Sequence, residues 1–128
     1  MSLKQTLRVM VVDDMSVSRG LLTQALEEMG VWNVDAESSA QSALTRLAAN
    51  PVHLVLSDYN MPGMDGLQLL HGLRQNRTTQ RIGFILVTGT PSPALIEQGR
   101  RLGLNNMVKK PFSTAQLKQA IEAVVGAL

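Results

Sequence analysis

The chain has 128 residues, of which 45% are apolar, and this is enough for one compact domain with a buried core. Its 12 basic and 10 acidic side chains leave a net charge of +2, which is too balanced to indicate binding to nucleic acid. Cysteine is absent, which excludes disulfides and thiolate metal sites. No apolar stretch has the length of a signal peptide or a membrane span. We therefore expect one domain over residues 1–128, a cytoplasmic monomer that binds neither nucleic acid nor a membrane.

The N-terminal half of the chain alternates between strand-like and helix-like stretches. A β-branched apolar run over Leu7–Val12 predicts a strand. An apolar stripe at four-residue spacing then predicts a helix that ends at Gly30, with the stripe formed by Val17, Leu21, Ala25 and Met29. A weaker strand around Val34 precedes a second helix, which ends at Asn50-Pro51 and carries Ala40, Ala43, Leu44 and Leu47.

The C-terminal half repeats this alternation three times. The apolar run His53–Ser57 predicts a strand that ends on Asp58, and a loop rich in glycine and proline separates it from a helix carrying Leu67, Leu70 and Leu73. Residues Ile82–Val87 predict the fourth strand, and Pro93 opens the fourth helix. A short strand at Met107-Val108 precedes the last helix, whose first turn has the capping-box sequence Ser113-Thr114-Ala115-Gln116.

The predicted elements form five strand-then-helix units, and the strands are continuous apolar runs. Strands of this kind are buried on both faces, which indicates an α/β fold with a parallel sheet between two layers of helices. Such sheets bind ligands at the C-terminal ends of their strands. The residues that follow the first, third, fourth and fifth strands are Asp13 and Asp14, Asp58, Thr88, and Lys110 before Pro111.

These strand ends predict a particular chemistry. Three carboxylates gathered in one crevice repel one another, and a cation offsets this repulsion. Oxygen ligands favour Mg²⁺ or Mn²⁺, and an adjacent lysine and hydroxyl suit phosphoryl oxygens. Together these groups describe a phosphoryl-transfer site in which Asp58 becomes an aspartyl phosphate. Taken alone, an acidic pair such as Asp13-Asp14 is more often a solvated turn or a helix cap.

Four stretches of the chain together resemble one protein family: VMVVDDMSVSR, LVLSDYNMPGMDG, ILVTGT and VKKPF. In this order and at these distances they are similar to the receiver domain of two-component response regulators, and more narrowly to the CheY-like single-domain chemotaxis regulators. The resemblance covers essentially the whole chain. It implies a doubly wound, flavodoxin-like sheet of five parallel strands in the order 2-1-3-4-5, with five helices in a three-layer sandwich.

The resemblance also assigns roles to the residues around the predicted phosphoacceptor, Asp58. Asp14 is expected to bind Mg²⁺ directly, and Asp13 to act on the metal mainly through water. The backbone carbonyl of Asn60 supplies a further metal ligand. Thr88 is expected to hydrogen-bond the phosphoryl group.

The resemblance makes Lys110 the lysine that contacts the phosphoryl group, with a cis bond to Pro111. Its neighbour Lys109 is then expected to take no part in the site. Two positions depart from the family pattern. Met107 stands where relatives have an aromatic ring whose rotation, coupled to Thr88, reports phosphorylation, and Thr90 stands where chemotaxis relatives have an acid.

The function implied by the resemblance is that of a phosphorylated switch. A histidine kinase donates the phosphoryl group, and a protein target, such as the flagellar switch, binds the face formed by the fourth helix, fifth strand and fifth helix. The domain is expected to assist its own phosphorylation and dephosphorylation without being a turnover enzyme. One alternative is a receiver in a phosphorelay or another two-component pathway. A second is a small phosphohydrolase with an aspartyl nucleophile, which is disfavoured because Asn60 stands where a second carboxylate is needed.

Overall fold

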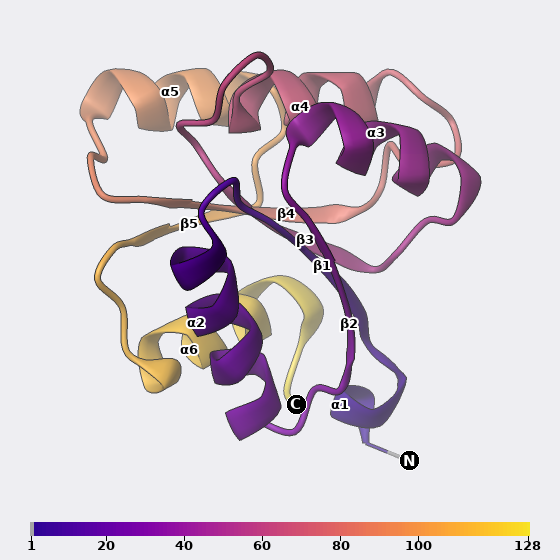
Figure 1. The fold of residues 1–128 in the computed structure, drawn as a ribbon, viewed down its shortest axis with the longest axis vertical. Coiled ribbons are helices and arrows are strands. Elements are labelled where there is room, and N and C mark those ends of the chain that lie inside the picture. The colour runs from indigo at the N-terminus through magenta and orange to yellow at the C-terminus, as the bar shows by residue number, and fades with distance from the viewer. Residues whose placement is uncertain (1) are drawn as a thin grey trace.

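A five-stranded parallel sheet forms the centre of the molecule in the computed structural model, which describes residues 2–128 (Figure 1). The order of the strands is β2-β1-β3-β4-β5, as the sequence analysis predicts. All neighbouring strands pair in parallel. The strands are β1 (Arg8–Val12), β2 (Asn33–Glu37), β3 (Leu54–Asp58), β4 (Gly83–Thr88) and β5 (Asn106–Lys109).

Helices cover both faces of this sheet, with α2 and α6 on one face and α3, α4 and α5 on the other (Figure 1). The helices are α1 (Leu3–Thr6), α2 (Ser16–Glu28), α3 (Ala40–Ala49), α4 (Gly66–Arg74), α5 (Pro93–Arg101) and α6 (Thr114–Val125). No helix in residues 2–128 is long and apolar enough to cross a lipid bilayer.

The five predicted helices are all present, and the structure adds a sixth, the short α1, before the first strand. This helix has a single turn of four residues and buries none of them. An apolar period cannot reveal a helix that has no buried face. Its first turn is stabilised locally, since the backbone N–H of Ser2 donates to the Gln5 side chain at 3.3 Å.

The core is divided into two layers by the sheet. Val9 and Val11 of β1 pack into the layer beneath α2 and α6, and Met10 and Val12 pack into the layer beneath α3, α4 and α5. Successive side chains of a strand point to opposite faces. The strand ends are therefore held from both sides, which fixes the positions of the residues that follow them.

The face that α2 buries differs from the predicted stripe. Its buried residues are Leu22, Ala25 and Leu26, whereas Val17 and Leu21 are 74% and 56% exposed. A helix has 3.6 residues per turn, so a constant spacing of four drifts by about 40° at each step and leaves the buried face. Trp32, shortly after α2, is also exposed, at 70%.

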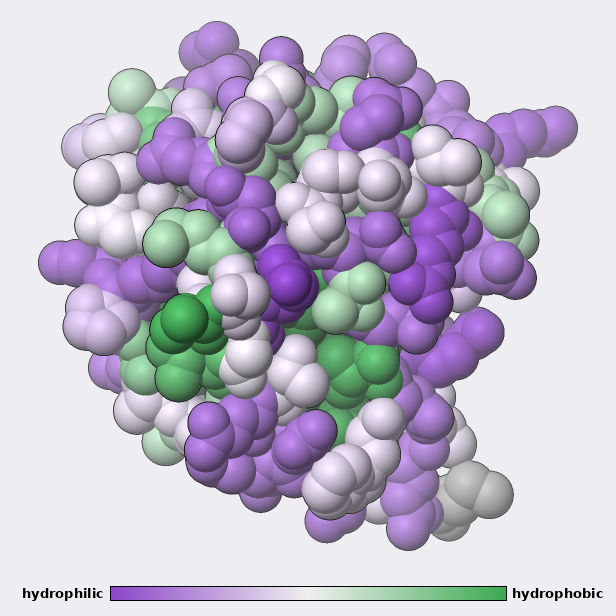
Figure 2. All heavy atoms as spheres, viewed as in Figure 1, coloured by the Kyte–Doolittle hydropathy of each residue, from purple (hydrophilic) through white to green (hydrophobic). Residues whose placement is uncertain are grey.

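Apolar side chains gather over α2 and beside it on a surface that is otherwise mostly polar (Figure 2). The large hydrophobic residues exposed on or directly before α2 are Met15, Val17 and Leu21.

At the start of α6, the predicted capping box is present, and the side chain of Ser113 accepts a hydrogen bond of 3.1 Å from Gln116 N.

The first turn of α4 packs directly on the end of β3. The backbone N–H of Gly66 donates to the carbonyl of Tyr59 at 2.9 Å and closes the loop between the two elements. A Cβ at Gly66 would clash with the carbonyl oxygen of Asp58 and would lie 2.8 Å from Leu86 Cδ1. Only glycine allows this approach, and it brings the loop back against the end of the strand.

We expect Gly66→Ala to lower the free energy of unfolding by about 2 kcal/mol, because the added methyl group forces the backbone of β3 and α4 apart. The matched control is Gly20→Ala in α2, where an added Cβ meets no atom within 4 Å. That change should be neutral or stabilising by up to about 1 kcal/mol, since alanine favours the helix. Urea unfolding of the two variants measures both effects, and equal stabilities would contradict the packing argument.

Candidate functional site

Three carboxylates meet at the C-terminal edge of the sheet. Asp13 and Asp14 directly follow β1, and Asp58 is the last residue of β3. These strands are neighbours, and Val12 pairs with Ser57, so the acidic residues of the two strands emerge side by side. One carboxylate oxygen from each of the three residues lies within 4.8 Å of the other two. The sheet therefore forces together charges that would separate in solution.

Asp13 is fully buried, and both of its carboxylate oxygens are occupied. Oδ1 accepts a hydrogen bond from the backbone N–H of Met15 at 3.0 Å. Oδ2 accepts one from the hydroxyl of Ser18 and lies 3.3 Å from the ammonium of Lys110. The carbonyl oxygen of Asp13 accepts a further bond from Arg19 Nη1 at 2.8 Å. These contacts tie the acid to the first turns of α2.

Asp58 is held by one of its two oxygens. Oδ1 accepts the backbone N–H of Tyr59 at 2.9 Å and lies 3.3 Å from Lys110 Nζ. Within residues 2–128, Oδ2 has no hydrogen-bond partner. Burial raises the pKa of the Asp58 carboxyl, the charge of Lys110 lowers it, and the charge of Asp13 raises it again. Because the net pKa is raised, the charged form is less favourable here than in water, and an added cation would stabilise it.

Lys110 joins the two strands that carry the acids. Its Nζ lies 3.3 Å from both Asp13 Oδ2 and Asp58 Oδ1, and 2.9 Å from the Ser18 hydroxyl oxygen. Its backbone N–H donates to the carbonyl of Thr88 at 2.9 Å, and its bond to Pro111 is cis, as expected. The neighbouring Lys109 is exposed. One lysine thus offsets part of the negative charge of the cluster.

The other predicted residues surround this cluster without contacting its carboxylates. Thr88 is buried at the end of β4, and its hydroxyl accepts the backbone N–H of Thr90 at 3.2 Å. Asn60 is exposed in the loop after β3. Met107 of β5 is half-buried against the core layer beneath α3, α4 and α5. A hydroxyl and a backbone carbonyl are therefore near the strand ends that carry the acids.

Sequence reasoning misses Ser18 and Arg19, which both contact Asp13. The available signal is their spacing. They lie five and six residues after Asp13, in the first turns of a helix that begins at Ser16. Side chains in the first turns of a helix lie close to the loop that leads into it. A polar residue there can contact an acid at the strand end.

The donor set suits a hard divalent cation. All three side chains offer carboxylate oxygens, and Asp14 is exposed and has no side-chain hydrogen bond among residues 2–128. Mg²⁺ prefers such oxygens and keeps several of its waters, which requires an open site. The exposed carboxylate of Asp14 meets that requirement, whereas the buried and fully bonded carboxylate of Asp13 does not.

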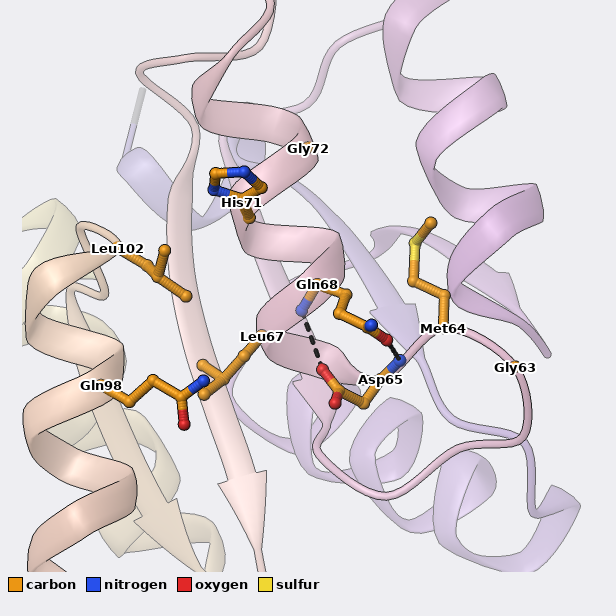
Figure 3. Close-up of a pocket in the computed structure, with 9 residues that line it drawn as sticks. All are labelled: Gly63, Met64, Asp65, Leu67, Gln68, His71, Gly72, Gln98 and Leu102. Carbon is orange, nitrogen blue, oxygen red and sulfur yellow. Dashed lines mark hydrogen bonds between the residues drawn. The ribbon is translucent and has the colours of Figure 1, made fainter.

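A surface groove between α4 and α5 lies apart from the carboxylates (Figure 3). Two of its polar residues are paired with each other, since Asp65 and Gln68 exchange two hydrogen bonds of 2.8 Å that cap α4. His71 and Gln98 come from the two facing helices, and Leu67 and Leu102 supply apolar surface. No cluster of charged groups lines this groove, and the chemistry of the molecule is concentrated at the sheet edge.

Comparison with known proteins identifies relatives over most of the chain. Residues 9–122 match the family described as the response regulator receiver domain. The probable chemotaxis protein CheY of Rhizobium etli is 39% identical over 128 residues, which is 100% of this chain and 99% of that protein.

Two solved structures share the fold. The chemotaxis protein CheY4 of Vibrio cholerae, with 24% identity and a TM-score of 0.86, covers 92% of this chain and 98% of its own. The receiver domain of a sensor histidine kinase from Pseudomonas aeruginosa, with 21% identity and a TM-score of 0.85, covers 94% and 98%. That structure holds a magnesium ion in its active site cleft. The carboxylate cluster, the strand order and the match over residues 9–122 agree, and this chain belongs to the response regulator receiver family, with chemotaxis proteins of the CheY type among its relatives.

Proposed function

We propose that this receiver accepts a phosphoryl group from a histidine kinase on Asp58, in the presence of Mg²⁺, and then changes its affinity for a protein target in the control of flagella. The observation that carries the proposal is the cluster of three carboxylates and one lysine at a single sheet edge. The 39% identical chemotaxis relative supports the pathway. The receiver over residues 1–128 acts as a switch that phosphorylation turns on, and it does not turn over a substrate as an enzyme does.

Asp58 Oδ2 is the proposed nucleophile. Oδ1 is already engaged by Tyr59 N–H and Lys110, whereas Oδ2 is free to approach a phosphorus atom. The new O–P bond forms as the P–N bond of phosphohistidine breaks, and the imidazole leaves with a proton from solvent. Hydrolysis of the resulting acyl phosphate by water returns the carboxylate.

The remaining residues offset charge and contact the phosphoryl oxygens. Asp14, Asp58 and the carbonyl of Asn60 are the proposed ligands of Mg²⁺, and Asp13 acts through a metal-bound water. When bound, the ion neutralises charge that develops on the transferring phosphoryl group.

Lys110 and Thr88 are the proposed contacts of the phosphoryl oxygens. The hydroxyl of Thr88 accepts from Thr90 N and keeps its own proton, which it can donate to a phosphoryl oxygen. A shift of Thr88 toward the phosphoryl group would carry the signal from β4 to the face formed by α5, β5 and α6, which is the proposed target surface.

Asp58→Asn should abolish labelling by both a histidine kinase and acetyl phosphate, because an amide is not the nucleophile that the reaction needs. The measurement is the incorporation of ³²P per mole of protein at saturating Mg²⁺. Asp65→Asn is a suitable control, since Asp65 caps α4 away from the cluster. Labelling of the Asp58 variant at the wild-type rate would refute the proposed function, and turnover of a phosphate ester far beyond one equivalent would favour a phosphohydrolase.

Asp14→Ala should weaken Mg²⁺ binding at least tenfold and more than Asp13→Ala does. Of these two residues, only Asp14 has a carboxylate that is exposed and has no hydrogen bond within the described chain. Isothermal titration with Mg²⁺ and Mn²⁺ gives the two dissociation constants. Thermal unfolding in EDTA serves as the control, because Asp13 also anchors α2 through Ser18 and Met15 and its loss should destabilise the protein. Equal metal affinities in the two variants would contradict the assignment of Asp14 as a direct ligand and of Asp13 as a residue that acts through water.

Met107→Tyr should increase the effect of phosphorylation on target binding. A methionine adapts through several rotamers and has no ring to exchange between two positions. We therefore expect a wild-type gain of only about tenfold, or roughly 1.4 kcal/mol of coupling. The test compares target affinity with and without beryllofluoride, with Met107→Leu as a control that adds no ring. A wild-type gain of a hundredfold, unchanged by tyrosine, would place the switch in other residues.

A further inference from the structure

The hydroxyl of Ser18 lies between the buried acid and the lysine of the site. It donates its single proton to Asp13 Oδ2, so a lone pair of the same oxygen accepts from Lys110 Nζ at 2.9 Å. This is the shortest of the three contacts that the ammonium makes, since the two carboxylate oxygens are at 3.3 Å. The hydrogen bonds therefore run in one direction, from Lys110 through Ser18 to Asp13.

These three contacts match the three N–H groups of the ammonium. If the function proposed above holds, phosphorylation turns the charged Asp58 carboxylate into the uncharged acyl group of an acyl phosphate, which is a weaker acceptor for a cation. The N–H directed at Asp58 Oδ1 is then the one that is released to a phosphoryl oxygen. The contacts with Ser18 and Asp13 involve groups that the reaction leaves unchanged.

We propose that Ser18 is a positioning residue, whose hydroxyl anchors the ammonium of Lys110 within reach of Asp58 before and during phosphoryl transfer. The backbone of Lys110 lies on the far side of β4 from Asp58, and a side chain of this length has many rotamers when nothing holds its end. Ser18 reduces this freedom from the opposite side, because α2 is fixed to the core by Leu22 and Leu26. The positioning of Lys110 before the reaction rests on these contacts alone. Its positioning during phosphoryl transfer rests on the proposed function.

The variant Ser18→Ala tests the anchor without endangering the fold, because alanine favours the helical conformation that Ser18 adopts. Ser18→Thr keeps a hydroxyl and is the rescue variant. Ser16→Ala is the matched control, since it removes an exposed hydroxyl from the same helix. Ser18→Thr and Ser16→Ala should unfold at urea concentrations close to that of the wild type, and Ser18→Ala slightly below it, because it removes one of the contacts by which Asp13 holds α2.

The first readout is the exchange of the Lys110 ammonium protons with water, measured by NMR on metal-free protein labelled with ¹⁵N-lysine. We expect exchange to be faster in Ser18→Ala and unchanged in Ser18→Thr and Ser16→Ala, because the loss of one acceptor frees the ammonium. Lys110→Ala identifies the signal. Unchanged exchange in Ser18→Ala would overturn the proposal, whatever the phosphorylation rate.

The second readout is the rate of labelling by acetyl phosphate at saturating Mg²⁺. We expect Ser18→Ala to be about fivefold slower, the effect of one net hydrogen bond. Threonine should restore the rate, and Ser18→Ala should cause no further loss when Lys110 is already alanine. A loss that persists without the lysine, or no loss while exchange is faster, would overturn the positioning role. If the wild-type protein takes no label, the proposed function is refuted. The proton-exchange measurement still tests whether Ser18 holds the ammonium of Lys110.

Discussion

The repulsion among three carboxylates at one sheet edge is the constraint on which the site depends. Asp13, Asp14 and Asp58 cannot separate, because β1 and β3 pair side by side and both core layers hold these strands in place. Folding therefore creates a local excess of negative charge, and Lys110 offsets only part of it. The pKa of Asp58 is raised mainly because its carboxyl is buried, and the charge of Asp13 adds to this effect while the charge of Lys110 opposes it. A site with this deficit of positive charge favours a cation.

The reach of Lys110 depends on the order of the strands. β5 is separated from β3 by β4, so the ammonium must extend over one strand to contact Asp58 and over two to contact Asp13. Neighbouring strands are about 4.8 Å apart, so β3 lies about 10 Å and β1 about 14 Å from β5. A side chain as long as that of lysine is needed to reach toward both. Because the side chain is long, its end needs a local anchor, and the only neutral group that contacts it among residues 2–128 is Ser18.

The alternation of strands and helices and the positions of the acids could be predicted from local patterns in the sequence, whereas the order of the strands came from the family resemblance. Apolar runs mark the strands, and a polar residue directly after a run must emerge at the sheet edge. Ser18 could not be found in this way. Its role arises from contact with a lysine 92 residues away, and no periodicity carries that information. The predicted stripe also does not show that Val17 and Leu21 are exposed. Residues spaced by four turn gradually away from the buried face, because a helix has 3.6 residues per turn.

The single tryptophan of the chain has a consequence for spectroscopy. Trp32 is 70% exposed and directly precedes β2, whose first residue pairs with the first residue of β1. It therefore lies at the N-terminal edge of the sheet, the opposite end from the carboxylates. Tyr59, the residue next to Asp58, is the chain's one tyrosine. Indole emission is accordingly expected to change little when a metal or a phosphoryl group binds, so an optical assay of this receiver needs a fluorophore introduced at the other end of the strands.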